Sequence, residues 1–112
     1  MRVVVDWDGT ATETDVLHLV LCEFGDERVY HRAERALARG MTLEEVIALE
    51  FATVRAPLAE VVAWVGEHVR LRPGFVAFAR RRRPLVVSSG FHELIAPILR
   101  RERLELEVVA NR

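Results

Sequence analysis

Two aspartates spaced two residues apart follow a run of three valines near the start of the chain, within residues 6–10, Asp-Trp-Asp-Gly-Thr. Alternate residues of a strand point to the same side, so we expect Asp6 and Asp8 to share one side. Gly9 permits a sharp turn, which brings the Thr10 hydroxyl within reach of the carboxylates. These residue types at this spacing predict a site that binds a divalent cation and attacks a phosphoryl group.

The same five residues also suit an ordinary strand-to-loop transition, since Asp, Gly and Thr are common in loops. From average residue usage, this pattern should occur by chance in a chain of this size on the order of once in a thousand. The pattern also directly follows an apolar strand, which lowers the probability of a chance occurrence further. We therefore prefer the functional interpretation.

The elements that must position these residues follow from the apolar periodicity and from the turn residues. A capping box at residues 42–45 opens the third helix, and Thr12 or Thr14 is expected to cap the first. Strands are predicted over residues 2–6, 85–87 and 104–110. Helices are predicted over residues 13–24, 27–39, 43–53, 57–69, a short stretch ending at 80–83, and 92–101.

This order predicts an α/β fold with a parallel sheet, right-handed crossovers and about four helices inserted between the first two strands. In such sheets, ligands bind beyond the carboxyl ends of the strands. Asp6 and Asp8 end the first strand, Ser88 ends the second and Asn111 follows the third. Polar residues are thus expected to meet at one edge of the sheet.

The composition limits the partners and the compartment. The chain has 112 residues and a formal net charge of −1, which gives no reason to expect nucleic acid or an anionic membrane as a partner. No apolar stretch is long enough to span a membrane and no signal peptide is recognisable, so a cytoplasmic location is expected. The lone cysteine, Cys22, excludes an intramolecular disulfide and is expected to be a buried structural thiol.

Five segments resemble the haloacid dehalogenase (HAD) superfamily of phosphatases, in the branch with a small helical cap after the first strand. The chain is most similar there to the phosphoserine phosphatase group and to the methionine-salvage phosphatases that act on a 2-hydroxy-3-keto-5-methylthiopentenyl phosphate. The matching segments are residues 6–10, Arg-Pro-Gly-Phe at 72–75, Val-Val-Ser-Ser-Gly-Phe at 86–91, residues 95–99 and residues 110–112.

The resemblance implies a HAD-like Rossmannoid parallel sheet, with about three strands present and a helical cap inserted. Residues 1–12 and 72–112 would form the core, which is incomplete, and residues 13–71 the cap. The match runs through the whole chain but corresponds only to about the first half of a complete family member.

Carried over to matching positions, the family's chemistry makes Asp6 the nucleophile that forms an aspartyl phosphate and Asp8 the general acid and base. Mg²⁺ would be held by Asp6 and Asp8. Thr10 and Ser88, with the Ser89 and Gly90 backbone, would bind the phosphate. The alternative role for Ser88 is a helix N-cap.

The substrate implied is a small phosphorylated metabolite. Asp15 lies near the position where family members place substrate-selecting residues, and Arg55, expected on the inserted helices, is a weaker candidate for a substrate contact. A structural role at the start of a helix is an equal alternative for Asp15, and a solvated arginine is the alternative for Arg55. The four histidines show no ligand spacing, so no metal is expected at them: His18, His31, His68 and His92.

Two parts of the family pattern are absent. The family supplies a lysine or arginine beside the phosphate, but all 16 basic residues here are arginine and none sits at the matching position; the candidate stand-ins are Arg100, Arg101, Arg103 and Arg112. No aspartate follows Asp26, so the late acidic motif has no counterpart. The first strand would then be an exposed apolar edge. We expect either a homo-oligomer or a complementing chain that covers this edge, unless the chain is one piece of a longer protein.

The absent pattern leaves alternatives open. The chain could be a non-catalytic HAD-fold remnant or subunit that serves as a binding or assembly module, or half of a split phosphatase. A receiver-like domain phosphorylated on Asp6 fits less well, because such domains carry no long helical insertion after the first strand.

Overall fold

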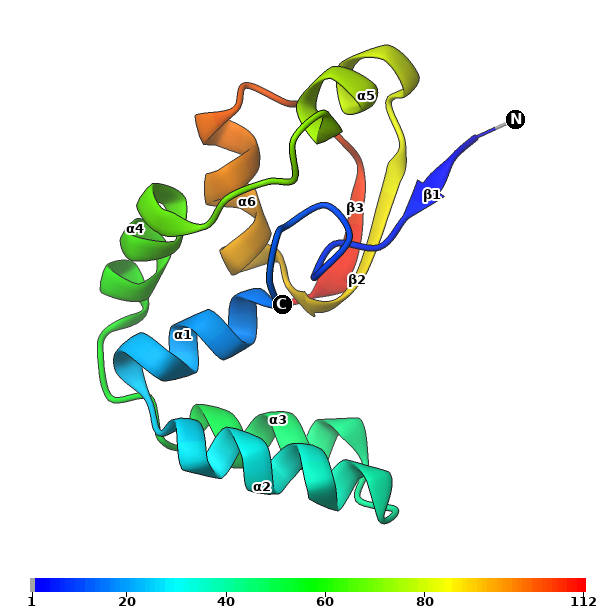
Figure 1. Ribbon diagram of the computed structural model, residues 1–112. Coiled ribbons are helices and arrows are strands. Elements are labelled where there is room, and N and C mark those ends of the chain that lie inside the picture. The colour runs from blue at the N-terminus through cyan, green and yellow to red at the C-terminus, as the bar shows by residue number, and fades with distance from the viewer. Residues whose placement is uncertain (1) are drawn as a thin grey trace. The chain divides into compact units, whose positions relative to one another are not determined.

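The computed structural model describes residues 2–112 and has a mixed α/β architecture (Figure 1). In this part of the chain three strands form one parallel sheet, accompanied by six helices. The strands are β1 (Val4–Val5), β2 (Leu85–Phe91) and β3 (Val108–Asn111). The helices are α1 (Val16–Phe24), α2 (Glu27–Ala38), α3 (Leu43–Phe51), α4 (Leu58–His68), α5 (Phe75–Arg82) and α6 (His92–Arg101).

The sheet has the order β1-β2-β3, so β2 is central. Val86 pairs with Val5 on one side and with Val108 on the other, and its side chain is fully buried. Helix α6 packs against β2 and β3 (Figure 1) and contributes the buried Ile95 and Ile98. The parallel sheet predicted from the order of elements is thereby confirmed.

A row of valines stays exposed on the sheet. Val4, Val87 and Val109 have exposed fractions of 60%, 41% and 53%. Val87 pairs with Val109, and Val4 pairs with Leu85, two residues before Val87, so all three lie on one face. The expectation that another chain covers β1 stays a prediction, which a stable monomer in sedimentation at micromolar concentration would contradict.

The chain forms two compact units. Met1–Val16 and Val62–Arg112 form the first, which we call the sheet unit, and Leu17–Val61 forms the second, the helical unit. Inside the sheet unit, Thr12 and Leu71 form an isolated antiparallel bridge. The two predicted borders of the inserted cap, at 12/13 and 71/72, therefore lie side by side. The compact units divide elsewhere, because residues 13–16 and 62–71 of the predicted cap belong to the sheet unit.

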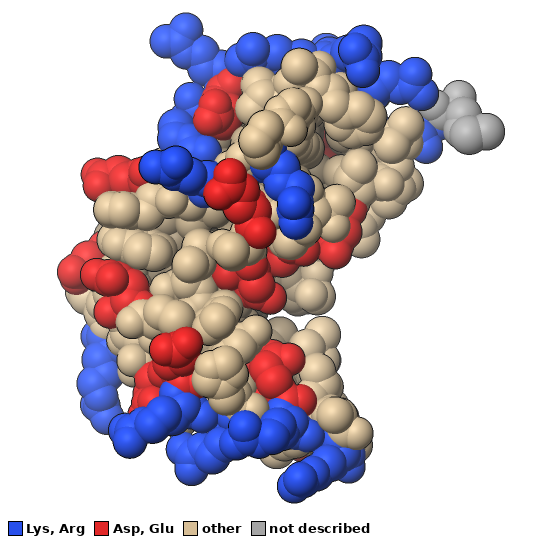
Figure 2. Space-filling view, viewed as in Figure 1, with Lys and Arg blue, Asp and Glu red and all other residues tan. Residues whose placement is uncertain are grey.

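The helical unit is built on the packed pair α2 and α3. Asp26 caps α2 by accepting a hydrogen bond from the Arg28 backbone N–H at 2.9 Å. Thr42 caps α3 in the same way, with the Glu45 N–H at 3.2 Å, as the capping box predicts. Blue side chains gather over α2 in Figure 2. Arg28, Arg32 and Arg35 of this helix are exposed.

Several predicted boundaries are wrong. Helix α1 begins at Val16 rather than near residue 13, and neither Thr12 nor Thr14 caps it, because the Thr12 hydroxyl bonds within the preceding loop. Strand β2 continues through Phe91 instead of ending before Ser88, and β3 begins at Val108 rather than at residue 104.

Cys22 is exposed, so the prediction of a buried thiol is wrong. The buried side chains of α1 are Val16, Val20 and Leu21. Cys22 lies one turn after His18, so these two residues share a face of the helix that differs from the buried one. No helix within residues 2–112 combines the length and the apolar character that crossing a bilayer would require.

Candidate active site

The loop after β1 turns around the backbone carbonyl of Trp7. This oxygen accepts hydrogen bonds from the N–H groups of Thr10, Ala11 and Thr12 at 3.2, 2.9 and 3.1 Å. Gly9 adopts a φ of 72°, the left-handed region in which glycine is unstrained. The Trp7 side chain is 1% exposed, whereas Asp6 before it is exposed, as alternation along an extended chain requires.

Two side chains fix this loop from opposite sides. The buried Thr12 hydroxyl accepts a hydrogen bond from the Gly9 N–H at 3.0 Å and donates one to the Thr14 carbonyl at 2.6 Å. The Arg72 guanidinium donates to the Gly9 carbonyl from Nη2 at 2.8 Å and from Nε at 3.2 Å. Sequence reasoning placed Arg72 only in a matching segment and missed this positioning role.

Asp8 lies at the centre of the candidate site. Its Oδ1 accepts a hydrogen bond from the Val16 N–H at 2.9 Å, at the first turn of α1. Its Oδ2 accepts a longer one from the Ser88 hydroxyl at 3.4 Å. The carboxylate thus links the loop after β1 to both α1 and β2.

The surroundings of Asp8 favour its protonated form. Partial burial raises the pKa of Asp8 above its ordinary value, and the negative charges of Asp15 and Asp6 raise it further. The hydrogen bonds from Val16 and Ser88 act in the opposite direction without cancelling this effect. A carboxyl group that keeps its proton more readily is suited to general acid catalysis.

Asp6 differs from Asp8 in exposure. It is open to solvent, and its Oδ1 accepts a hydrogen bond from the Trp7 N–H at 2.8 Å. Its other carboxylate oxygen makes no hydrogen bond within residues 2–112. Asp6 and Asp15 both lie close enough for their charges to act on Asp8. Carboxylate oxygens are the ligands that Mg²⁺ prefers, but the oxygens of Asp6, Asp8 and Asp15 do not all lie within 4.8 Å of one another, so these three side chains do not form a closed set of ligands.

The predicted phosphate-binding residues are only partly brought together. Ser88 is buried within β2, and its hydroxyl also accepts a hydrogen bond from the Gly90 N–H at 2.9 Å. A Cβ on Gly90 would lie 3.3 Å from Asp8 Oδ2, so glycine keeps this approach open. Asp8, Ser88 and Gly90 therefore form one contiguous group.

Other predicted contacts differ from the sequence-based expectation. The N-cap of α6 is Phe91, so the alternative role of Ser88 as a helix N-cap is wrong. The Gly90 N–H already bonds to Ser88, while the exposed Ser89 accepts a hydrogen bond from Asn111 through its carbonyl at 2.8 Å. Thr10 is exposed and lines a different hollow, with Arg72 and Phe78.

The two predicted substrate contacts fall in different units. Asp15 is exposed and directly precedes α1 in the sheet unit, where its charge acts on Asp8. Arg55 is exposed in the helical unit, in the connection between α3 and α4 rather than on a helix. Only Asp15 therefore belongs to the same compact unit as Asp8.

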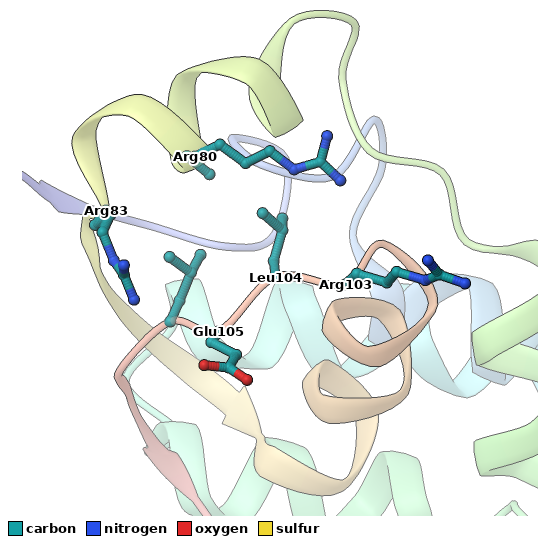
Figure 3. A pocket seen from close by; sticks show the side chains of 7 residues that line it. Arg80, Arg83, Arg103, Leu104 and Glu105 are labelled. Carbon is teal, nitrogen blue, oxygen red and sulfur yellow. The ribbon is translucent and has the colours of Figure 1, made fainter.

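An arginine-lined pocket of about 240 Å³ lies elsewhere in the sheet unit (Figure 3). Arg83 and Arg103 line it with backbone φ values of 45° and 56°, and Arg80 donates a hydrogen bond to the Glu102 carbonyl at 3.0 Å. Figure 3 shows the three guanidinium groups lying apart from one another, so they do not converge on one anion.

Two of the four histidines meet at one carboxylate, which their spacing in the sequence did not predict. His18 and His31 both lie against the carboxylate of Glu27, in the helical unit. The signal in the sequence is a pair of i, i+4 repeats, His18 with Cys22 and Glu27 with His31, on either side of a short turn.

No protein-family model matches the chain, and no curated protein matches it in sequence. The resemblance to HAD phosphatases therefore rests on the residues that were compared above.

Proposed function

We propose that the chain is a phosphatase of the HAD type, which hydrolyses a phosphomonoester on a small metabolite through an aspartyl phosphate. In this proposal the sheet unit is a HAD-like Rossmannoid core, the inserted helices are its cap, and the location is cytoplasmic. The observation that supports it best is the contact between Asp8 and Ser88, 3.4 Å apart although 80 positions separate them in sequence. Both residues come from segments that resemble the family.

The first step uses Asp6 as the nucleophile, because it is the exposed carboxylate of the pair. A carboxylate oxygen of Asp6 attacks the phosphorus atom, and the bond from phosphorus to the alcohol oxygen breaks. Asp8 gives its proton to the departing alkoxide, for which its raised pKa is suited. The products of this step are the alcohol and an acyl phosphate on Asp6.

The second step regenerates the enzyme. Asp8, now ionised, removes a proton from a water molecule as the water oxygen attacks the phosphorus. The bond from phosphorus to Asp6 breaks, which releases inorganic phosphate and restores the Asp6 carboxylate. Asp8 regains the proton that it gave away, so one group serves as acid and then as base.

Mg²⁺ would be held by Asp6 and the Asp8 region, with the charge of Asp15 nearby. When bound, the cation would neutralise charge on the phosphoryl oxygens as the nucleophile approaches. The Ser88 hydroxyl is poised to turn from Asp8 Oδ2 to a phosphoryl oxygen. Thr10 and the Ser89 and Gly90 backbone complete the proposed phosphate contacts, and Asp15 and Arg55 the proposed substrate contacts.

The test compares hydrolysis of p-nitrophenyl phosphate with Mg²⁺ by the wild type and by Asp6→Asn. We expect the variant to lose at least ~10³-fold in kcat, because a nucleophile is removed. Glu13→Gln is the matched control, because Glu13 is an exposed acidic residue on the same loop. Its backbone N–H donates a hydrogen bond to the Arg70 carbonyl, and the substitution leaves this bond in place. Equal rates for the wild type and Asp6→Asn would reject the proposal.

The second candidate is a non-catalytic module on the same fold. It is favoured by the absence of lysine and of any aspartate after Asp26, which removes the usual charge partners of the phosphate. Phosphate binding without turnover, weakened by Ser88→Ala, would favour this candidate over the enzyme.

A further inference from the structure

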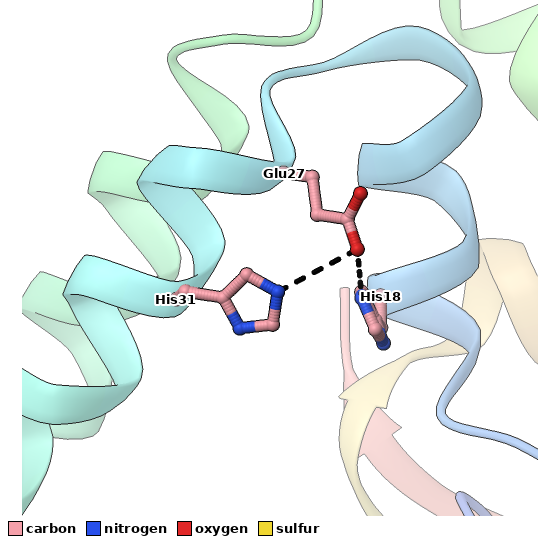
Figure 4. A group of neighbouring side chains, drawn as sticks. All are labelled: His18, Glu27 and His31. Atoms are coloured by element: carbon pink, nitrogen blue, oxygen red, sulfur yellow. Dashed lines mark hydrogen bonds and ion pairs between the residues drawn. The ribbon is translucent and has the colours of Figure 1, made fainter.

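Three metal-binding side chains converge in the helical unit (Figure 4). His18 lies on α1, and Glu27 and His31 lie one turn apart on α2. One potential ligand atom from each lies within 4.8 Å of the other two. His18 Nε2 is 3.3 Å from Glu27 Oε1, and His31 Nε2 is 3.5 Å from the same oxygen.

These separations suit a small cation. Ligand atoms that each lie ~2.0–2.1 Å from a tetrahedral zinc ion are separated from one another by about 3.3–3.4 Å. The two distances to Glu27 are 3.3 and 3.5 Å, and the ligand atoms of His18 and His31 lie within 4.8 Å of each other, so binding would require the two imidazole rings to move toward each other. Imidazole nitrogens prefer zinc and its neighbours among the transition metals over Mg²⁺.

The neighbouring residues hold the ligands in place. The His18 ring stacks on Tyr30, with the ring centroids 4.2 Å apart and the planes 4° from parallel. Glu27 and His31 have the i, i+4 spacing of one helix face. Such support reduces the conformational entropy that is lost when an ion binds.

The group is also accessible. The exposed fractions of the His18, Glu27 and His31 side chains are 33%, 53% and 54%. An ion can therefore enter from solvent, and a water molecule can complete a four-coordinate shell. Desolvation and, after it, the negative charge of Glu27 raise the pKa of the Cys22 thiol, but the sulfur is outside the set of mutually close atoms, so we assign three ligands.

We propose that His18, Glu27 and His31 form a binding site for a divalent transition-metal ion, of which Zn²⁺ is the natural example. The site is separate from the phosphatase chemistry proposed above, because all three ligands belong to the helical unit and Asp6 and Asp8 to the sheet unit. Its three protein ligands leave one coordination position open.

The experiment titrates Zn²⁺ into the tag-free, chelator-treated full chain by calorimetry. We expect one ion per chain with a Kd of about 10 µM or lower, and no competition from Mg²⁺. His31→Gln and Glu27→Gln should each weaken binding at least ~10-fold. The matched controls are His68→Gln and Glu34→Gln, both on exposed helical positions, and these should bind as the wild type does.

The wild type alone provides a second measurement, which does not depend on the folding of variants. Zn²⁺ should shift the ring proton resonances of two of the four histidines, His18 and His31, in nuclear magnetic resonance spectra. Asp6→Asn should bind Zn²⁺ unchanged. A Kd above about 1 mM, or equal losses in His31→Gln and His68→Gln, would overturn the proposal.

Discussion

The carboxylates of Asp8 and Glu27 belong to different units and have opposite surroundings. Partial burial and two neighbouring carboxylates raise the pKa of Asp8. Hydrogen bonds from His18 and His31 instead lower the pKa of Glu27, whose side chain is exposed to solvent. The same functional group thus keeps its proton to higher pH in the sheet unit and loses its proton at lower pH in the helical unit.

The two environments also differ in how they are built. Asp8 is held by the Val16 N–H and by Ser88, in a loop anchored by the buried Trp7. Glu27 is held between side chains on the surface of two helices. Substitutions near Asp8 should therefore affect folding as well as chemistry, whereas those around Glu27 should affect ligand binding more than folding.

The largest effect is expected from Trp7→Ala, which tests whether the Asp8 loop depends on the core. Trp7 is 1% exposed and packs edge-on against Phe75, with the centroids 6.1 Å apart. Its loss should lower the free energy of unfolding by about 3–5 kcal/mol, measured by urea denaturation with circular dichroism. Leu49→Ala in the helical unit, 46% exposed, should cost less than about 1 kcal/mol. Equal costs would remove the contrast between the two units.

A smaller effect is expected from Gly90→Ala, which perturbs the Asp8 group without removing any part of it. The added Cβ would lie 3.2 Å from Ser88 Oγ and 3.3 Å from Asp8 Oδ2, so one of these atoms must move by a few tenths of an ångström. We expect kcat for p-nitrophenyl phosphate to fall about tenfold, or ~1.4 kcal/mol. Val87→Ala, on the exposed face of the same strand, should keep the wild-type rate. A Gly90→Ala enzyme with full activity would show that the contact of Asp8 with Ser88 has no part in catalysis.

The smallest effect is the pH dependence of stability, in which Asp8 and Asp26 should act in opposite directions. The pKa of Asp8 is raised from its ordinary 3.8, so its contribution is present at low pH and is lost as the pH rises through the native value. The Arg28 backbone N–H lowers the pKa of Asp26, so its contribution is present above 3.8 and is lost as the pH falls through the native value.

Thermal unfolding of the two asparagine variants measures this difference. The quantity to follow is the Tm of each variant minus the Tm of the wild type. For Asp8→Asn this difference should increase from pH 3 to pH 7, and for Asp26→Asn it should decrease over the same range. Shifts of about 1–3 °C are expected. Parallel shifts in both variants would contradict the assigned environments.

Sequence reasoning succeeded where the cause of a feature is local. The Thr42 cap of α3 depends on residues three positions apart, and the parallel sheet follows from the order of strands and helices. The start of α1 was wrong because its first turn is fixed by Asp8, eight residues earlier, while the nearby Thr12 hydroxyl bonds elsewhere. Helix caps supplied from a distance leave no local signal.

The candidate sites follow the same rule. Asp6 and Asp8 were found because both lie in one short segment, and the approach of Ser88 follows from the sheet topology. The group of His18, Glu27 and His31 was missed because its members lie on two helices, and the turn between them decides whether they meet.

The aromatic residues divide between the two units in a way that makes each unit optically distinct. Both tryptophans, Trp7 and Trp64, belong to the sheet unit, and the single tyrosine, Tyr30, belongs to the helical unit. The buried Trp7 indole N–H has no hydrogen-bond partner among the described residues, an environment that favours blue-shifted emission. Selective excitation of tryptophan therefore follows the sheet unit, and tyrosine absorbance follows the helical unit. Comparing the two signals during denaturation reveals whether the sheet unit and the helical unit unfold in one transition or in two.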